Sequence, residues 1–216
     1  MKILSQDFKA SSAALPLQPL HLLEEISHRV FNEYTEAIAT LRLAAVDAGN
    51  AQVSGTLNGV SNRLMAYANA HRALLEPASG GSVDLAAYVG QICTSMHKAL
   101  LAANGVRLLV DADETLLESA RSWRVGLIVA ELIRNAARHG LRGGPGAIRV
   151  SIAETCGWVS CRVSDNGRPT ANSQPGRGRR LVEALAAELG GSVDWSFTPA
   201  GCLVRLEIPT MVAPVR

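Results

Sequence analysis

The segment Glu131–His139 carries a carboxylate, an amide and an imidazole at four-residue spacing. On an α-helix, Glu131, Asn135 and His139 fall on one face, and the positions between them are mostly apolar or small. The amide oxygen of Asn135 can ligate Mg²⁺, which prefers oxygen ligands and substrate phosphates. Glu131 could order a water bound to that metal. Taken alone, this pattern fits a nucleotide site and an ordinary amphipathic helix equally well.

A second polar group follows a predicted strand. Val159, Cys161 and Val163 alternate with polar residues, which is typical of a strand buried on one face. This strand would end at Asp165, and Gly167 would then turn the chain. A buried carboxylate in this place can accept a hydrogen bond from an exocyclic amine such as that of adenine.

Two further glycines precede a predicted helix. Gly176 and Gly178 stand before the apolar-periodic segment Leu181–Leu189. Glycines that open a helix let backbone N–H groups approach phosphates, and the helix dipole favours the anion. Asp-Asn-Gly and Gly-x-Gly are each common, so only their order and spacing after the polar helix are specific.

This order of motifs resembles the ATP-binding domain of the GHKL superfamily. Glu131, Asn135 and His139 match its N box, and the Asp165 and Gly176 regions match its two glycine boxes. The resemblance implies ATP as substrate, with Mg²⁺ held by Asn135. The residues that it assigns to nucleotide binding are Asn135, Arg138, His139, Asp165, Gly167, Gly176, Gly178 and Arg179.

The N-terminal third predicts two antiparallel helices. Apolar residues recur near helical spacing before and after a turn at residues 47–50, and Pro77 ends the second run. Neither helix can bury so long a stripe alone, so pairing with a second copy is expected. The stripes comprise Ile26, Val30, Tyr34, Ile38, Leu41 and Ala45, and then Val53, Leu57, Val60, Leu64, Tyr67 and Leu74.

This hairpin resembles the dimerisation and phosphoacceptor domain of histidine kinases, in particular an HWE-related subfamily with the helix pattern Glu-x-x-His-Arg-x-x-Asn. Glu25, His28, Arg29 and Asn32 fit that pattern. The resemblance implies that His28 is phosphorylated. Glu24 or Glu25 could accept its proton, and Asn32 could orient water for dephosphorylation. His28 lies off the apolar stripe, so it is expected to face solvent or a cleft. Glu131 completes the predicted catalytic residues.

The expected fold class is α+β, with a helical hairpin that forms a four-helix bundle in a dimer, followed by a GHKL-type two-layer α/β sandwich. The predicted domains are a loose extension over 1–19, the hairpin over 20–78 and the ATP-binding domain over 79–210. Val83–Tyr88 is expected to open a helix, and Val106–Asp111 reads as a strand. The last strands form a hairpin around the turn at 198–201.

Two functions remain open at this point. The first is a kinase that transfers phosphate from ATP to His28 and then to an aspartate of a response-regulator receiver domain. The second is a phosphotransferase of the same architecture that relays phosphate without ATP. Pro169, which replaces the usual second glycine, and the short lid over 168–175 favour the relay, whereas the intact N box favours the kinase. An anti-sigma kinase fits less well, because it needs no phosphoacceptor hairpin.

Composition favours a cytoplasmic protein, whereas the homodimer is expected from the long apolar stripes of the hairpin. The net charge of +2 is too small to indicate a nucleic-acid partner, and no apolar run predicts insertion in a membrane. The four cysteines lack metal-ligand spacing, and Cys156 and Cys161 read as core positions.

Overall fold

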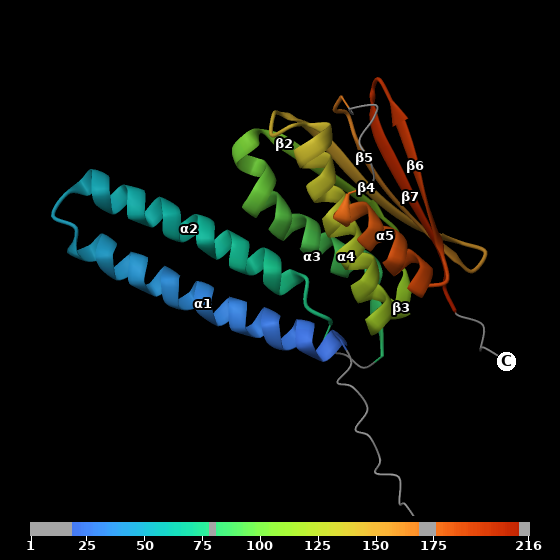
Figure 1. The fold of residues 1–216 in the computed structure, drawn as a ribbon, viewed down its shortest axis with the longest axis horizontal. Helices are drawn as coiled ribbons and strands as arrows, with labels where there is room; N and C mark the ends of the chain where they lie inside the picture. Colours follow the sequence, from blue (N-terminus) through green and yellow to red (C-terminus); the bar gives the residue numbers. More distant parts are fainter. Residues whose placement is uncertain (1–18, 78–80, 169–175, 212–216) are drawn as a thin grey trace, which may run out of the picture.

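The computed structural model describes residues 19–77, 81–168 and 176–211, with side chains from Arg29 onward. The expected extension, apart from Pro19, and Pro169 with most of the lid lie outside these residues. The described chain is α+β, as predicted: two long helices project from an α/β unit (Figure 1). No helix in the described part is long and apolar enough to cross a membrane.

The two long helices form the predicted hairpin. Helix α1 spans Pro19–Asp47 and helix α2 spans Ala51–Ala73. Asn50 caps α2, because its side-chain oxygen accepts the Gln52 N–H at 2.8 Å. Ile38 and Ala45 of α1 are buried against α2, which presents small buried residues such as Ser61 and Ala68.

One part of the predicted α2 stripe does not face α1. Val53 and Val60 are 49% and 45% exposed, and Leu43 and Val46 of α1 are 67% and 83% exposed. Leu57, which belongs to the predicted stripe, and Ser61, which does not, are both more buried than Val53 and Val60. Helical periodicity showed that both helices are amphipathic but could not tell which flank pairs within the chain. The hairpin therefore carries apolar side chains near its turn that a single chain leaves exposed.

Two ring contacts join the helices near the other end of the hairpin. The Tyr34 and His71 rings lie 5.7 Å apart between centroids. One turn closer to the start of α1, the Arg72 guanidinium carbon lies 5.7 Å from the centroid of the Phe31 ring. Both contacts fix the rotation of α2 relative to α1.

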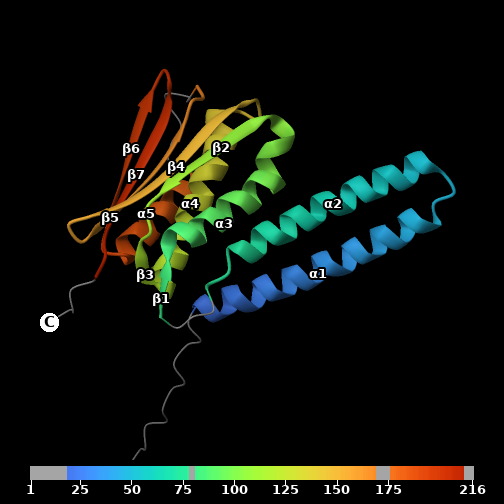
Figure 2. The same cartoon turned by 180° about the vertical axis from the view of Figure 1, so that it is seen from behind.

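The α/β unit is a two-layer sandwich built on a five-stranded sheet in the order β2-β4-β5-β7-β6. Only the β2–β4 pair is parallel, so the sheet is mixed, as expected. Three helices cover one of its faces (Figures 1 and 2). The strands are β2 (Val106–Ala112), β4 (Gly146–Thr155), β5 (Trp158–Asp165), β6 (Ser192–Thr198) and β7 (Gly201–Pro209), and the helices are α3 (Leu85–Met96), α4 (Ser119–Asn135) and α5 (Arg177–Glu188).

The predicted alternation in β5 is confirmed, since Val159, Cys161 and Val163 are at most 2% exposed and point at the helices. Cys156 is not a core residue, because it is exposed in the turn between β4 and β5. Cys156 and Gly157 have φ values of 52° and 78°, which make a tight two-residue hairpin connection. A turn of this kind requires positive φ, which burial patterns do not reveal.

A small second sheet precedes α3. Strand β1 (Ser82–Asp84) pairs with β3 (Leu116–Glu118), so α3 begins at Leu85 and not at Val83 as the sequence predicted. Asp84 ends the strand and caps the helix, since its side chain accepts the Ala86 N–H at 2.9 Å. After Met96 the helix widens into a π turn and then ends at Gly105, whose φ is 67°.

The segment that joins the hairpin to the α/β unit is held by side chains of α3 and α4. Three side chains each donate a hydrogen bond to a backbone carbonyl of residues 74–77. One belongs to α3 and the other two belong to the first part of α4. The pairs are Trp123 Nε1 to Leu74 at 2.8 Å, Tyr88 Oη to Leu75 at 3.1 Å and Ser119 Oγ to Pro77 at 2.8 Å. The hairpin is thus tied to the helix whose far end carries Asn135.

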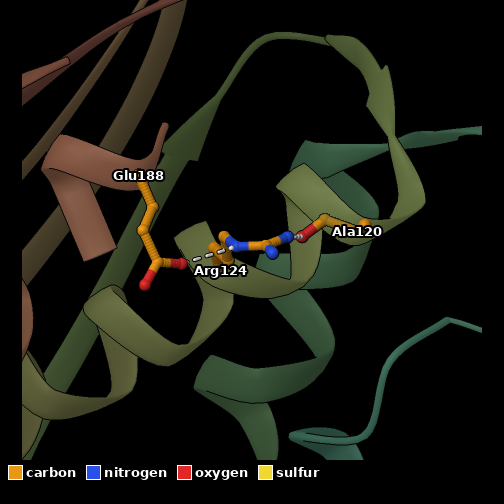
Figure 3. Close-up of polar contacts among 3 residues, drawn as sticks. All are labelled: Ala120, Arg124 and Glu188. Atoms are coloured by element: carbon orange, nitrogen blue, oxygen red, sulfur yellow. Dashed lines mark hydrogen bonds and ion pairs between the residues drawn. The ribbon is translucent and has the colours of Figure 1, made fainter. Parts of the chain in front are cut away.

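Helix α5 is fixed to α4 at its C-terminal end. Arg124 Nε donates to Glu188 at 3.1 Å, while its Nη1 donates to the Ala120 carbonyl of its own helix at 2.8 Å (Figure 3). The buried Arg121 guanidinium donates to the carbonyls of Leu189 and Pro209, at the ends of α5 and β7. Burial lowers the pKa of Arg121, although nearby Glu118 opposes this.

Candidate functional site

The three predicted motifs line one pocket of about 460 Å³. It lies between α4, the start of α5, the C-terminal ends of β5 and β6 and the N-terminal part of β7. The pocket thus brings together segments that are far apart in the sequence. Arg138 and Arg177 also line it, although only Arg138 was predicted. The predicted residues that line the pocket are Glu131, Asn135, Arg138, His139, Asp165, Gly176, Gly178 and Arg179.

The helix that carries the first motif is not a regular α-helix throughout. Helix α4 ends at Asn135 and continues as a π turn over Ala136–Gly140, in which the Leu141 N–H donates to the Ala136 carbonyl at 2.8 Å. The wider turn keeps the exposed His139 at the pocket together with Glu131 and Asn135. Such π turns are frequent at functional sites.

Glu131 lies at the boundary between α4 and α5. Its carboxylate is only 16% exposed and pairs with Arg134, one turn on, at 2.9 Å. It also lies so close to Gly178 that a Cβ there would overlap the carboxylate oxygen and approach the Asn135 amide to 3.4 Å. An acidic group at this helix N-terminus complements the dipole of α5.

The two glycines at the start of α5 differ in what the structure requires of them. Gly176 is the N-cap residue, whereas Gly178 lies in the first turn of the helix and not, as the sequence predicted, before it. Gly176 caps the helix with φ −74° and ψ 179°, a conformation open to any residue, and nothing lies near its Cβ position. Gly178 is the glycine that allows α5 to approach Glu131 and Asn135. Gly178 is therefore the glycine of this motif that has a steric role.

We expect Gly178→Ala to fold and to lose nucleotide affinity. The new methyl group must displace the flexible Glu131 side chain and narrow the pocket beside Asn135. A loss of about 1 kcal/mol, or roughly fivefold in Kd, is expected by calorimetry with ATP·Mg²⁺. Gly90→Ala is the matched control, because that helical glycine has open space around it and lies outside the pocket. Equal affinities of the Gly178→Ala and wild-type proteins would contradict the steric argument.

Asp165 is held at the end of β5 by the backbone. Its carboxylate accepts the Gly167 N–H at 2.9 Å and a backbone hydrogen bond from Cys202 of β7. Burial raises the pKa of the Asp165 carboxyl, and the two backbone hydrogen bonds only partly oppose this shift. The carboxyl can still present an oxygen to a hydrogen-bond donor in the pocket.

Two glycines missed by the sequence reading make room for Asp165. A Cβ at Gly140 would overlap the Asp165 carboxyl, and a Cβ at Gly201 would overlap its backbone oxygen. Gly201 also has φ 141°, which only glycine adopts easily. Gly167 packs on the Gly140 backbone, and the Arg168 N–H donates to the Gly140 carbonyl at 3.1 Å. The glycine directly after the first motif was a signal that could have been used.

An aromatic wall from β6 was also missed. Trp195 and Phe197 stack with centroids 6.4 Å apart and both line the pocket. The Arg179 guanidinium lies 5.0 Å from the Trp195 ring centroid and pairs with Glu183 at 2.9 Å. Arg179 is therefore held at the wall beside the start of α5, where an anion would be attracted.

The hairpin residues are placed only in part. Glu25, His28 and Asn32 lie in α1, and Asn32 is exposed. The side chains of Glu25 and His28 lie outside the described residues, so the expected exposure of His28 stays a prediction. No described side chain of the hairpin lines the pocket.

An amide-bearing helix, a glycine-rich helix start and a half-buried carboxylate line one pocket beside a mixed sheet, and a helical hairpin precedes them. Two family models match the chain: the histidine kinase-like ATPase domain over residues 96–207 and a histidine kinase model over residues 25–100. The chain therefore belongs to the histidine kinase family. The match of two models in this order agrees with the expected succession of hairpin and ATPase domain.

Relatives and solved structures agree with this family. Blue-light-activated histidine kinase 2 of Erythrobacter litoralis (strain HTCC2594) is 25% identical over 198 residues, which cover 87% of this chain and 56% of that protein. The chain thus spans about half the length of that relative.

Two solved structures share the fold. The histidine kinase domain of the Erythrobacter litoralis EL346 blue-light activated histidine kinase gives a TM-score of 0.58 at 24% identity, covering 88% of this chain and 92% of that one. A bacterial phosphotransferase gives a TM-score of 0.60 at 14% identity, with coverages of 90% and 98%. At these identities both likenesses concern the fold alone.

Proposed function

We propose that this protein is an ATP-dependent histidine kinase of two-component signalling, which phosphorylates His28 and passes the phosphoryl group to an aspartate of a response-regulator receiver domain. The observation that carries the proposal is the single pocket that joins Asn135, Asp165 and the start of α5. The family membership and the hairpin that contains His28 support it.

The residues present fit ATP with Mg²⁺. The Asp165 carboxyl can accept from an adenine amine, while Arg138, Arg177 and Arg179 bring positive charge to the phosphates. Gly178 leaves space at the helix N-terminus for an anion. Asn135 would hold Mg²⁺ by its amide oxygen. Among the described residues no cluster of three or more His, Cys, Asp or Glu could hold a metal, so Mg²⁺ would also need oxygens of the nucleotide.

The chemistry is a phosphoryl transfer that needs positioning more than covalent help. A ring nitrogen of His28 forms the N–P bond while the P–O bond to ADP breaks, and Glu25 takes the imidazole proton. When bound, Mg²⁺ would supply positive charge to the phosphate oxygens. Arg138 and Arg179 orient the phosphates, and the aromatic wall excludes water from one side of the pocket.

The test is to incubate the protein with γ-labelled ATP·Mg²⁺ and to measure label and binding in parallel. The kinase proposal predicts calorimetric binding of ATP and acid-labile label on the protein. Label that arrives only from a phosphorylated receiver domain, with no ATP binding, would replace the kinase with a phosphotransferase. Binding without any label from either source would overturn both.

We also propose that the protein is a homodimer through the hairpin. The exposed apolar side chains of the hairpin support this proposal, because a second copy could remove them from water. They are Leu43, Val46, Val53 and Val60. Val46→Glu and Val60→Glu should each weaken dimerisation at least about a hundredfold, since a carboxylate would be buried at the interface. Light scattering over a micromolar dilution series measures this.

The matched control for the dimer is Asn58→Glu, which adds the same charge at an exposed polar position of α2. It should leave the dimer intact. A monomer mass for the unmodified protein at micromolar concentration would refute the dimer proposal. The Leu41 and Leu64 positions are less suitable, because both are already partly buried in the described hairpin.

A further inference from the structure

Arg72 holds an unusual place in the hairpin. It belongs to the last turn of α2, yet its guanidinium lies over the ring of Phe31 in α1, 5.7 Å from the centroid. Among the described side chains no carboxylate pairs with Arg72, and Arg72 is exposed to solvent. An aromatic face thus orients this cation without neutralising it.

The ring contact brings Arg72 to the turn of α1 that contains His28. Phe31 follows His28 by three residues, so positions 28 and 31 share one helix face. Side chains of an α-helix lean toward its N-terminus, so the Phe31 ring covers the preceding turn. A guanidinium above that ring therefore lies at the level of position 28, although its own backbone is on the other helix.

Charge makes this placement useful. The sequence around His28 contributes Glu24, Glu25, Glu33 and Glu36, whereas Arg29 is the next residue and points about 100° further round the helix. A phosphoryl group at position 28 carries negative charge on three oxygens during transfer and afterwards. The planar guanidinium can donate two parallel hydrogen bonds to those oxygens.

We propose that Arg72, held over Phe31, contacts the phosphoryl group as it reaches His28 and stabilises the transferring charge. The inference rests on the proposed role of His28 and adds a catalytic residue from α2. Because Arg72 acts on the acceptor side, it serves transfer from ATP and transfer to or from a receiver aspartate alike. The nucleotide pocket does not depend on it.

The experiment measures initial rates of labelling with γ-labelled ATP·Mg²⁺ for the full chain. Arg72→Gln should lower kcat about tenfold or more and leave KM for ATP within about twofold, because one charge-stabilising donor is removed from the transition state. Arg72→Lys should recover part of the rate, and Phe31→Leu should slow labelling by removing the ring. The matched control is Arg63→Gln, an exposed arginine of the same helix more than two turns away.

Melting temperature and light scattering on the same variants test a purely structural role. A drop in kcat for Arg72→Gln with unchanged melting and mass, and partial rescue by lysine, supports the inference. If the wild-type protein is labelled on His28 and the Arg72→Gln protein is labelled at the same rate, the inference is overturned and the proposed function stands. Loss of rate that follows loss of melting temperature or dimer also overturns it. An unlabelled wild-type protein removes the proposed function and the inference together.

Discussion

Replacing His28 by alanine should abolish the label that the protein acquires from ATP. A ring nitrogen of the His28 imidazole accepts the phosphoryl group in the proposed transfer, so removal of the ring leaves no atom to form the N–P bond. ATP affinity and dimer mass should stay nearly unchanged, because a side chain expected to face solvent contributes little to packing. The measurement is acid-labile, base-stable label on the intact protein, with calorimetry and light scattering on the same sample.

His71→Ala is the matched control for this prediction. His71 is an exposed histidine of the same hairpin, and its ring lies 5.7 Å from that of Tyr34 at a tilt of 31°, so its loss tests for a general effect on the helices. Label should remain in this variant. Label that persists in His28→Ala would refute the phosphoacceptor assignment, whatever happens to ATP binding.

Asp165→Ala should reduce ATP affinity by about 1–3 kcal/mol, or roughly five- to 150-fold. The substitution removes the proposed acceptor for the adenine amine. It also frees the Gly167 N–H that the carboxylate accepts at 2.9 Å, so part of the loss comes from the loop itself. Calorimetry with ATP·Mg²⁺ gives the size of the effect.

Asp165→Asn separates these two contributions. Its oxygen can still accept from the Gly167 N–H, while its amide nitrogen presents a donor to the base. We therefore expect weaker ATP binding and a smaller preference for ATP over GTP, because guanine carries an acceptor where adenine carries an amine. An unchanged ATP-to-GTP ratio in this variant would show that Asp165 does not contact the base.

The pH dependence of binding follows from the same carboxyl. Burial raises the pKa of Asp165, so protonation on acidification begins at a higher pH than for an ordinary aspartate. The protonated form is a poorer acceptor, so ATP affinity should fall as the pH decreases toward that raised pKa. The Asp165→Asn protein should lack this part of the pH dependence.

The sequence was sufficient for features that repeat locally. Alternating Val159, Cys161 and Val163 predicted a half-buried strand, and the apolar period that follows Gly176 and Gly178 predicted the helix that the structure shows as α5. These features depend on neighbouring residues alone. An apolar repeat with a period of two residues for a strand, or 3.6 residues for a helix, is therefore enough to predict them.

Features that depend on contacts between distant segments could not be predicted in the same way. Gly140 and Gly201 are needed because the Asp165 region packs against both. Gly140 stands directly after the first motif, which was a local signal, whereas nothing near Gly201 in the sequence indicates this contact. Trp195 was predicted as a strand residue, but its place beside Arg179 depends on how β6 and α5 meet. The exposure of Val60 likewise depends on which flank of α2 meets α1.

Helix α4 joins two places that the chain would otherwise keep apart. Its first turns bind the carbonyls of the segment after α2 through Ser119 and Trp123, and its last turn carries Asn135. Seventeen residues of α-helix make a rod of about 25 Å. A rotation of α2 that keeps these hydrogen bonds must carry this rod with it. The proposed nucleotide site at the far end of α4 would then move together with α2. This coupling depends on whether the hydrogen bonds between α4 and the linker remain intact.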